Sequence, residues 1–213
     1  MESAVKSCVI SYANATDITI EPLKQNIVRD YIPFGSDNLF PQAIARISRT
    51  SPNHRGVINS KTTFMIGGGL VSDAYPELIT KANANKQTLS KVTKNLIFDD
   101  NTSGNAYCEI ITDSKKSFIY FNHLDFTKCR ISKDEKYVIM HPDWRKYEST
   151  KQYATSLPLY PNFEYVTSEN GAKLLRSVYH FKDYEPEFTY YGIPLGVAGK
   201  ASAQNDLETH KGD

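Results

Sequence analysis

The chain has 213 residues, of which 25 are basic and 24 acidic, so its formal net charge is +1 at pH 7. This balance excludes the broad positive field that captures nucleic acid or anionic membrane, although it is compatible with local patches. The length suits a single domain or slightly more. The N-terminus MESAVKSCVI lacks the apolar core of a signal peptide, and no apolar run reaches the length of a membrane helix, which predicts a cytosolic chain without a membrane contact.

The cysteines indicate neither a disulfide framework nor a zinc site. Cys8, Cys108 and Cys129 are odd in number and have no C-x-x-C spacing. We expect reduced thiols, with Cys108 and Cys129 in the core of strands.

The first predicted helix follows a weakly patterned segment. Residues 1–30 carry no sustained period, so we expect only partial order there. Ala43, Ile44 and Ile47 then have the spacing of one helix face. Pro41 precedes them and is tolerated in a first helical turn, which predicts a short amphipathic helix.

A second helix is predicted to begin at Ser51, because a serine N-cap followed by Pro52 is a strong start signal. Glycines 67–69 are expected to end it, since glycine adopts the left-handed conformation of a C-terminal cap. Its apolar face is predicted to contain Val57, Ile58, Lys61 and Met65.

A third helix is predicted over Thr88 to Phe98, after a polar connection at Ser72 to Asn85. Asp99 to Gly104 is expected to close this helix and lead into a sheet. One buried face is predicted from the spacing of Leu89, Val92, Leu96 and Ile97.

The second half of the chain reads as strands. Asn105 to Thr112 has the two-residue period of a core strand, and Phe118 to Phe121 is predicted to pair with it as a hairpin. The alternation places Ala106, Cys108 and Ile110 on the buried face.

Further strands are predicted at Thr127 to Ile131, Tyr137 to His141, Leu157 to Tyr160 and Leu174 to Phe181, with an exposed excursion after Met140. Because the helices come first and the strands afterwards, we expect an α+β fold in which N-terminal amphipathic helices pack on a mainly antiparallel β-sheet. The expected organisation is a helical part at 31–104, a β-rich part of the same domain at 105–195, and a polar tail at 196–213 that contains no aromatic residue.

No catalytic, cofactor-binding or metal site is assigned from the sequence. The triple glycine follows a helix, whereas a phosphate loop precedes one, so a cap and turn is the better interpretation. The pairs Asp99-Asp100 and Glu185 with Glu187 are interpreted as solvated turn acids. The histidines lack metal-ligand spacing and are interpreted as surface or hydrogen-bonded residues: His54, His123, His141, His180 and His210.

Several segments resemble tailed-bacteriophage portal proteins, particularly the type found in phages of Bacteroidetes-like hosts. The resemblance lies in YIPFGSDNLFPQ (Tyr31 to Gln42), SPNHRGVINSKTTFMIGGGL (Ser51 to Leu70), SGNAYCEI (Ser103 to Ile110), FNHLDFTKCRISKD (Phe121 to Asp134) and TYYGIP (Thr189 to Pro194). GNAY followed by a hairpin, an H-L-D segment and an arginine-bearing strand is the most specific combination.

The resemblance implies a non-enzymatic wing region from a ring at one capsid vertex, with no catalytic residues to carry over. Partners implied for the full-length family are other copies of itself, capsid protein, terminase, head-completion proteins and double-stranded DNA. Localisation would be the virion for an active phage and the host cytoplasm otherwise. Because portals continue beyond the YYGIP segment, we expect a truncated or remnant form that is a monomer or weak oligomer, associating through exposed aromatics near Trp144 and Tyr190.

Two alternatives stay open at this point. A free-standing binding module would use Trp144, Arg145, Lys146 and Tyr147 to stack on and neutralise nucleic acid, or to hold a phage protein. An unrecognised hydrolase would use the paired acids.

Overall fold

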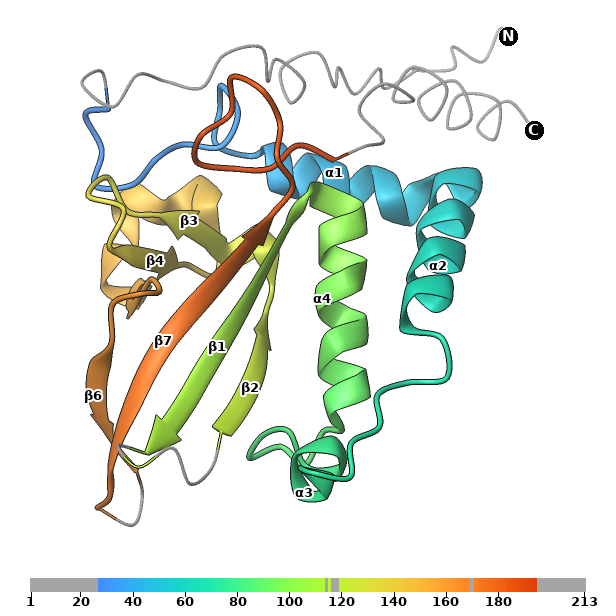
Figure 1. Cartoon of the computed structure of the whole chain (residues 1–213). Coiled ribbons are helices and arrows are strands. Elements are labelled where there is room, and N and C mark those ends of the chain that lie inside the picture. The colour runs from blue at the N-terminus through green and yellow to red at the C-terminus, as the bar shows by residue number, and fades with distance from the viewer. Residues whose placement is uncertain (1–26, 114, 116–118, 169–170, 195–213) are drawn as a thin grey trace, which may run out of the picture.

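The computed structural model describes residues 27–194 except 114, 116–118 and 169–170, so the expectations for 1–26, including Cys8, and for 195–213, including His210, fall outside the described residues. The α-helices precede the strands in the described chain, which confirms the α+β class (Figure 1). The helices are α1 (Phe40–Thr50), α2 (Pro52–Ile66), α3 (Pro76–Thr80) and α4 (Leu89–Ser103). The strands are β1 (Asn105–Asp113), β2 (Ile119–Leu124), β3 (Cys129–Ile131), β4 (Tyr137–Met140), β5 (Thr155–Pro158), β6 (Glu164–Thr167) and β7 (Lys173–Lys182).

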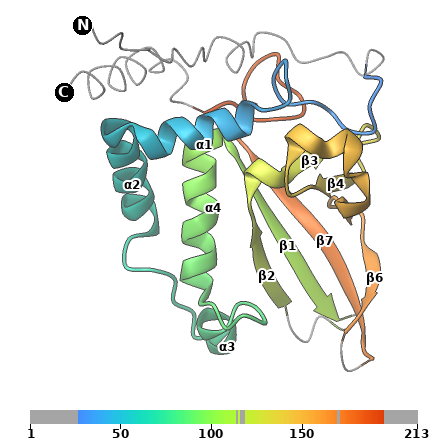
Figure 2. The ribbon, with the colours of Figure 1, turned by 180° about the vertical axis from the view of Figure 1, so that it is seen from behind.

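The strands form two antiparallel sheets where the sequence predicted one. The larger sheet has the order β2-β1-β7-β6, and the smaller has the order β3-β4-β5. The predicted hairpin is present, with Ile110 paired to Phe121. Strand β6 was not predicted, because its four residues alternate too briefly to give a period. Figure 2 shows the smaller sheet covering the side of the larger sheet that faces away from α4.

The start and end of α2 follow the prediction. The Ser51 side chain accepts a hydrogen bond from the His54 amide at 3.3 Å, and the helix ends at Gly67 as predicted. The backbone of Gly67, at φ 53° and ψ −131°, is outside the left-handed helical conformation that was expected of this cap. The predicted apolar face is wrong in part. Ile58 and Thr62 are the buried residues, whereas Val57 and Met65 are 67% and 54% exposed.

Helix α4 starts within one residue of the predicted start, with Thr88 as its N-cap, but extends beyond Phe98 to Ser103. The hydroxyls of Thr102 and Ser103 donate to the carbonyl oxygens of Phe98 and Asp99, which keeps these polar residues compatible with a helix. Gly104 caps the end in the left-handed conformation, and a Cβ there would lie 2.7 Å from the Ile193 carbonyl oxygen.

Strand β1 is buried on both faces at its start. Ala106 and Cys108 are buried as predicted, and Ile110 is half-buried. Tyr107, on the opposite face, is only 1% exposed because the main core, which includes β3, β4 and the loop before α1, covers it.

Candidate functional site

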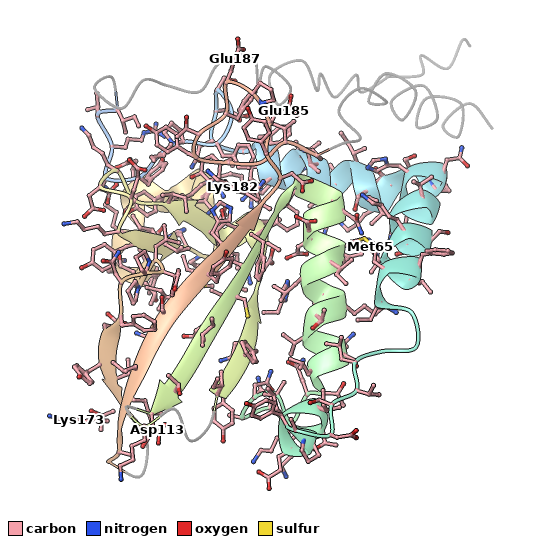
Figure 3. The ribbon with its side chains drawn as sticks, in the orientation of Figure 1. Met65, Asp113, Lys173, Lys182, Glu185 and Glu187 are labelled. Carbon is pink, nitrogen blue, oxygen red and sulfur yellow. The ribbon has the colours of Figure 1, made fainter. Side chains whose placement is uncertain are left out.

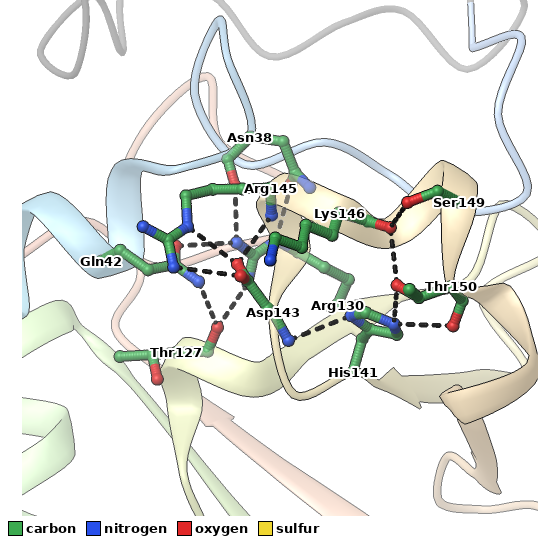
Figure 4. A network of polar contacts seen from close by, with 10 residues as sticks. All are labelled: Asn38, Gln42, Thr127, Arg130, His141, Asp143, Arg145, Lys146, Ser149 and Thr150. Carbon is green, nitrogen blue, oxygen red and sulfur yellow. Dashed lines mark hydrogen bonds and ion pairs between the residues drawn. The ribbon is translucent and has the colours of Figure 1, made fainter.

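Arg130 is the centre of a buried polar network that joins β3 to the loop before α1 (Figure 4). Its Nε donates to Asn38 Oδ1 at 2.6 Å, and its Nη2 donates to the Asn38 carbonyl oxygen at 2.6 Å. The remaining bonds go to Gln42 Oε1 and to the carbonyl oxygens of Thr127 and Cys129. Asn38 itself adopts φ 62°, and its Oδ1 also accepts from the Phe34 amide.

All five acceptors are uncharged oxygens, although Arg130 is fully buried. Burial lowers the pKa of the guanidinium, whereas nearby aromatic hydroxyls and the Cys129 thiol act in the opposite direction. The guanidinium also lies 4.8 Å from the centre of the Trp144 ring. This arrangement fixes the loop and leaves no arginine donor for a ligand, so we assign it a structural role.

The predicted exposed excursion after Met140 is wrong in part, because most of its residues are exposed but its aromatic rings at Trp144 and Tyr147 are buried. Residues Trp144–Ser149 and Lys151–Tyr153 form 3-10 helices, and Trp144 and Tyr147 pack with Tyr31 in a second core cluster. The Trp144 indole donates to the Lys128 carbonyl oxygen at 2.8 Å, and Tyr147 donates to Asp30 at 2.7 Å. Neither ring is available to stack on a base, which removes the nucleic-acid module built on them. It also removes Trp144 as a self-association surface.

Asp99 was interpreted as a solvated turn acid, and the structure corrects this. Its side chain is buried within α4, and its Oδ2 lies 2.6 Å from His123 Nε2. Burial raises the pKa of Asp99, whereas the hydrogen bond with His123 lowers it. Burial likewise raises the pKa of half-buried Asp100, together with the nearby Asp183 carboxylate. The sequence does contain a signal for the burial of Asp99. If the predicted helix is continued past Phe98, its helical period places Asp99 on the same face as Val92 and Leu96.

The arrangement around Asp99 does not activate a nucleophile. Cys108 is paired with His123 across β1 and β2, which gives a thiol, an imidazole and a carboxylate in one region. Burial, with a contribution from Glu109, raises the pKa of the Cys108 thiol to about 12, so it stays protonated near neutral pH. Within the described residues, no cluster of three metal-ligating side chains occurs.

The other histidines have hydrogen-bonding or packing roles. His141 is buried and bonds to the Thr150 carbonyl oxygen at 3.0 Å. His180 bonds to Asn105 at 3.0 Å and stacks on Tyr107. His54 is half-buried, and burial lowers its pKa.

The acids Glu185 and Glu187 are exposed in the loop after β7, as expected of solvated residues (Figure 3). The triple glycine also keeps its predicted position at the C-terminal end of α2.

The apolar groove between α4 and the larger sheet is the candidate functional site. The groove has a volume of about 850 Å³ and opens to solvent. Its helix wall contains the four residues of the predicted apolar face of α4. Of these four, only Val92 is fully buried, because the groove leaves the others partly open to solvent. Its sheet wall contains Ala106, Cys108, Ile110, Phe121, Tyr179 and Phe181.

The groove continues into a row of exposed aromatic rings, which we call the aromatic row: Phe181, Tyr179, Tyr160 and Phe163. Successive ring centres are 4.6, 5.6 and 6.0 Å apart. The cross-strand register pairs Tyr179 with Cys108 and Phe181 with Ala106, so both rings lie on the α4 side of the sheet. The four side chains are 40% to 50% exposed. A contiguous apolar surface of this kind is typical of a site that binds a partner or a ligand.

No protein-family model matches the chain, and no curated protein matches it. Solved structures do resemble it. A chain from the "Virion of native gene transfer agent (GTA) particle" gives a TM-score of 0.57 at 14% identity, over 79% of this chain and 43% of that one. A chain from the "Neck of empty GTA particle computed with C6 symmetry" gives 0.55 at 14% identity, over 80% and 44%. A chain from the "Neck of native GTA particle computed with C12 symmetry" gives 0.53 at 13% identity, over 79% and 43%.

At these identities the likeness shows the fold alone. The chain spans less than half the length of the gene transfer agent chains that it resembles. Among the residues that the structure describes, no helix is both long and apolar enough to span a membrane.

Proposed function

We propose that the chain is a non-enzymatic structural protein of a phage-like particle and corresponds to the wing region of a portal protein. The observation that carries this proposal is the fold likeness over about four fifths of the chain to proteins of gene transfer agent virions and necks. The portal-like segments in the sequence support the finer assignment to a portal wing. They occur between Tyr31 and Pro194 in the order in which portal proteins have them.

The side-chain arrangement supports a structural role. Arg130, the most buried charged residue in the part of the chain that the structure describes, fixes a loop. The exposed surface beside α4 is apolar and aromatic, as in a protein that binds other proteins. On this proposal the protein resides in the virion, and its partners are other copies of itself and the proteins of the particle vertex, with DNA passing through the ring that they form.

Purified particles from cells that produce them test the proposal. Mass spectrometry of particles banded in a density gradient should detect this chain at a small fraction of the capsid protein, as a protein of one vertex requires. Its absence from intact, DNA-filled particles would contradict the proposal. A gene for a terminase large subunit upstream and a capsid gene downstream would support the portal assignment, whereas unrelated neighbouring genes would count against it.

A further inference from the structure

Helix α2 has an uncharged face directed away from the rest of the molecule. At 100° per residue, Asn53, Gly56, Val57, Ser60 and Phe64 fall within one arc opposite the buried Ile58 and Thr62, and all five are exposed. Val57 is 67% exposed and Phe64 is 91% exposed. We call these five residues the α2 face.

The two charged residues of α2, Arg55 and Lys61, lie outside this arc. The Arg55 guanidinium lies 4.5 Å from the centre of the Phe98 ring on α4. Lys61 lies close enough to Asp100 of α4 to lower the pKa of that carboxyl group. Met65 also accepts a hydrogen bond from Asn101, on the side of α2 that faces α4 (Figure 3). An ordinary surface helix has the reverse pattern, with charges outward and apolar residues inward, so the α2 face has the character of an interface.

The α2 face and the aromatic row are two separate apolar surfaces of one chain. Helix α4 lies between α2 and the larger sheet in both views (Figures 1 and 2). The two surfaces therefore belong to different sides of the molecule. A contact between two different surfaces of identical subunits is a head-to-tail contact, which closes into a ring when the rotation between subunits allows it.

We propose that the α2 face of one copy docks on the aromatic row of the next copy, with Phe64 packed among the rings of Tyr160 and Tyr179. This proposal rests on the proposed function, because a ring of identical subunits supplies the second copy. The α2 face has small residues at Gly56 and Ser60, two turns and one turn before Phe64, so a partner surface can approach the helix backbone closely there.

The areas involved predict a weak contact for the isolated chain. A large aromatic side chain buries about 150 to 250 Å², so four half-exposed rings offer roughly 400 Å² and the α2 face somewhat less. Their sum falls below the roughly 1,000 Å² of a stable interface. Assembly would therefore need the other vertex proteins or a high local concentration, which agrees with the expectation of a monomer or weak oligomer in solution.

A complementation experiment separates this contact from other modes of association. Wild type should self-associate in sedimentation at about 1 mM, a concentration that half-saturates a millimolar contact. Phe64→Lys removes one surface and Tyr179→Glu removes the other, so each variant alone should lose this association. An equal mixture should form dimers and nothing larger, because an intact α2 face meets an intact aromatic row only between unlike copies. Val71→Lys, at another exposed apolar residue, is the matched control and should associate like wild type.

A photo-crosslinking amino acid at position 64 locates the contact. In a mixture of isotopically light and heavy chains, the expected products join position 64 of one copy to Tyr160, Phe163 or Tyr179 of another. Products that join position 64 to position 64, or to residues 1–26 or 195–213, would overturn the proposal, as would the absence of intermolecular products at about 1 mM. If the chain is found in particles but the mixture stays monomeric, the docking proposal fails alone. If the mixture forms dimers but particles lack the chain, the proposed function fails and the contact stands.

Discussion

Replacing Arg130 by methionine should lower the free energy of unfolding by about 3 kcal/mol, because it breaks the network that ties β3 to the loop before α1. The substitution removes five hydrogen bonds and leaves the Asn38 and Cys129 carbonyl oxygens without their arginine donor. Each buried acceptor left without a donor costs about 1 to 3 kcal/mol.

An opposing effect limits the loss. Arg130 is a fully buried cation whose acceptors are all uncharged, so its own desolvation already costs several kcal/mol, which the substitution recovers in part. Methionine also retains most of the apolar volume beside Trp144. Three oxygens lose their arginine donor, namely the Asn38 and Cys129 carbonyl oxygens and Gln42 Oε1. Their loss outweighs the recovered desolvation, and the net effect is a loss of about 3 kcal/mol.

Urea denaturation followed by tryptophan fluorescence provides the assay, since Trp144 is the single tryptophan and stacks near Arg130. Arg145→Met is the matched control, because Arg145 is exposed and pairs locally with Asp143, so its loss should leave the urea midpoint nearly unchanged. Asn38→Gly keeps the left-handed backbone and removes the side-chain acceptor, and its effect should not add fully to that of Arg130→Met. A change below about 1 kcal/mol for Arg130→Met would refute the reasoning.

Four further predictions follow from particular groups. Ser51→Ala should lower stability by about 0.5 to 2 kcal/mol through loss of the α2 cap, and an unchanged urea midpoint would place the helix start elsewhere. In a Cys8→Ser background, Cys108 and Cys129 should react with a disulfide reagent at pH 8 only after unfolding, because burial raises the pKa of both thiols; rapid reaction of the native protein would contradict their burial. Burial lowers the pKa of His180 to about 3, so the unfolded state takes up the proton first and stability should fall as pH drops from about 6.5 toward 3, a dependence that His180→Asn should flatten. Binding to double-stranded DNA, measured by anisotropy, should be weak and lost as salt rises, since the chain is close to neutral; tight binding near physiological salt would favour a nucleic-acid module.

Local signals in the sequence predicted the local parts of the fold. Ser51-Pro52 gave the start of α2, and the alternation from Asn105 gave β1 and its hairpin with β2, because caps and short-range pairing depend on neighbouring residues. The α+β class followed from the order of these elements.

Contacts between distant segments were beyond such signals. The Arg130 guanidinium bonds to Asn38, 92 residues earlier, and no local pattern connects them. The mixture of charged and aromatic residues from Trp144 to Tyr147 has no period and so predicts an exposed loop. In the structure its two rings pack against Tyr31, which is more than 100 residues earlier, and no local pattern indicates that contact. The aromatic row likewise combines a β7 face with the Tyr160 loop, so only the folded chain brings its rings together.

The central claim is that this chain is a wing-like subunit of a ring in a phage-like particle, and cryo-electron microscopy of the neck and vertex of purified particles tests it most directly. The account predicts a ring at one vertex in which each subunit contains density fitted by α1 to β7, with the α2 face of one copy against the aromatic row of the next. A neck without this fold, or the fold found only in monomeric protein outside the particle, would contradict the account.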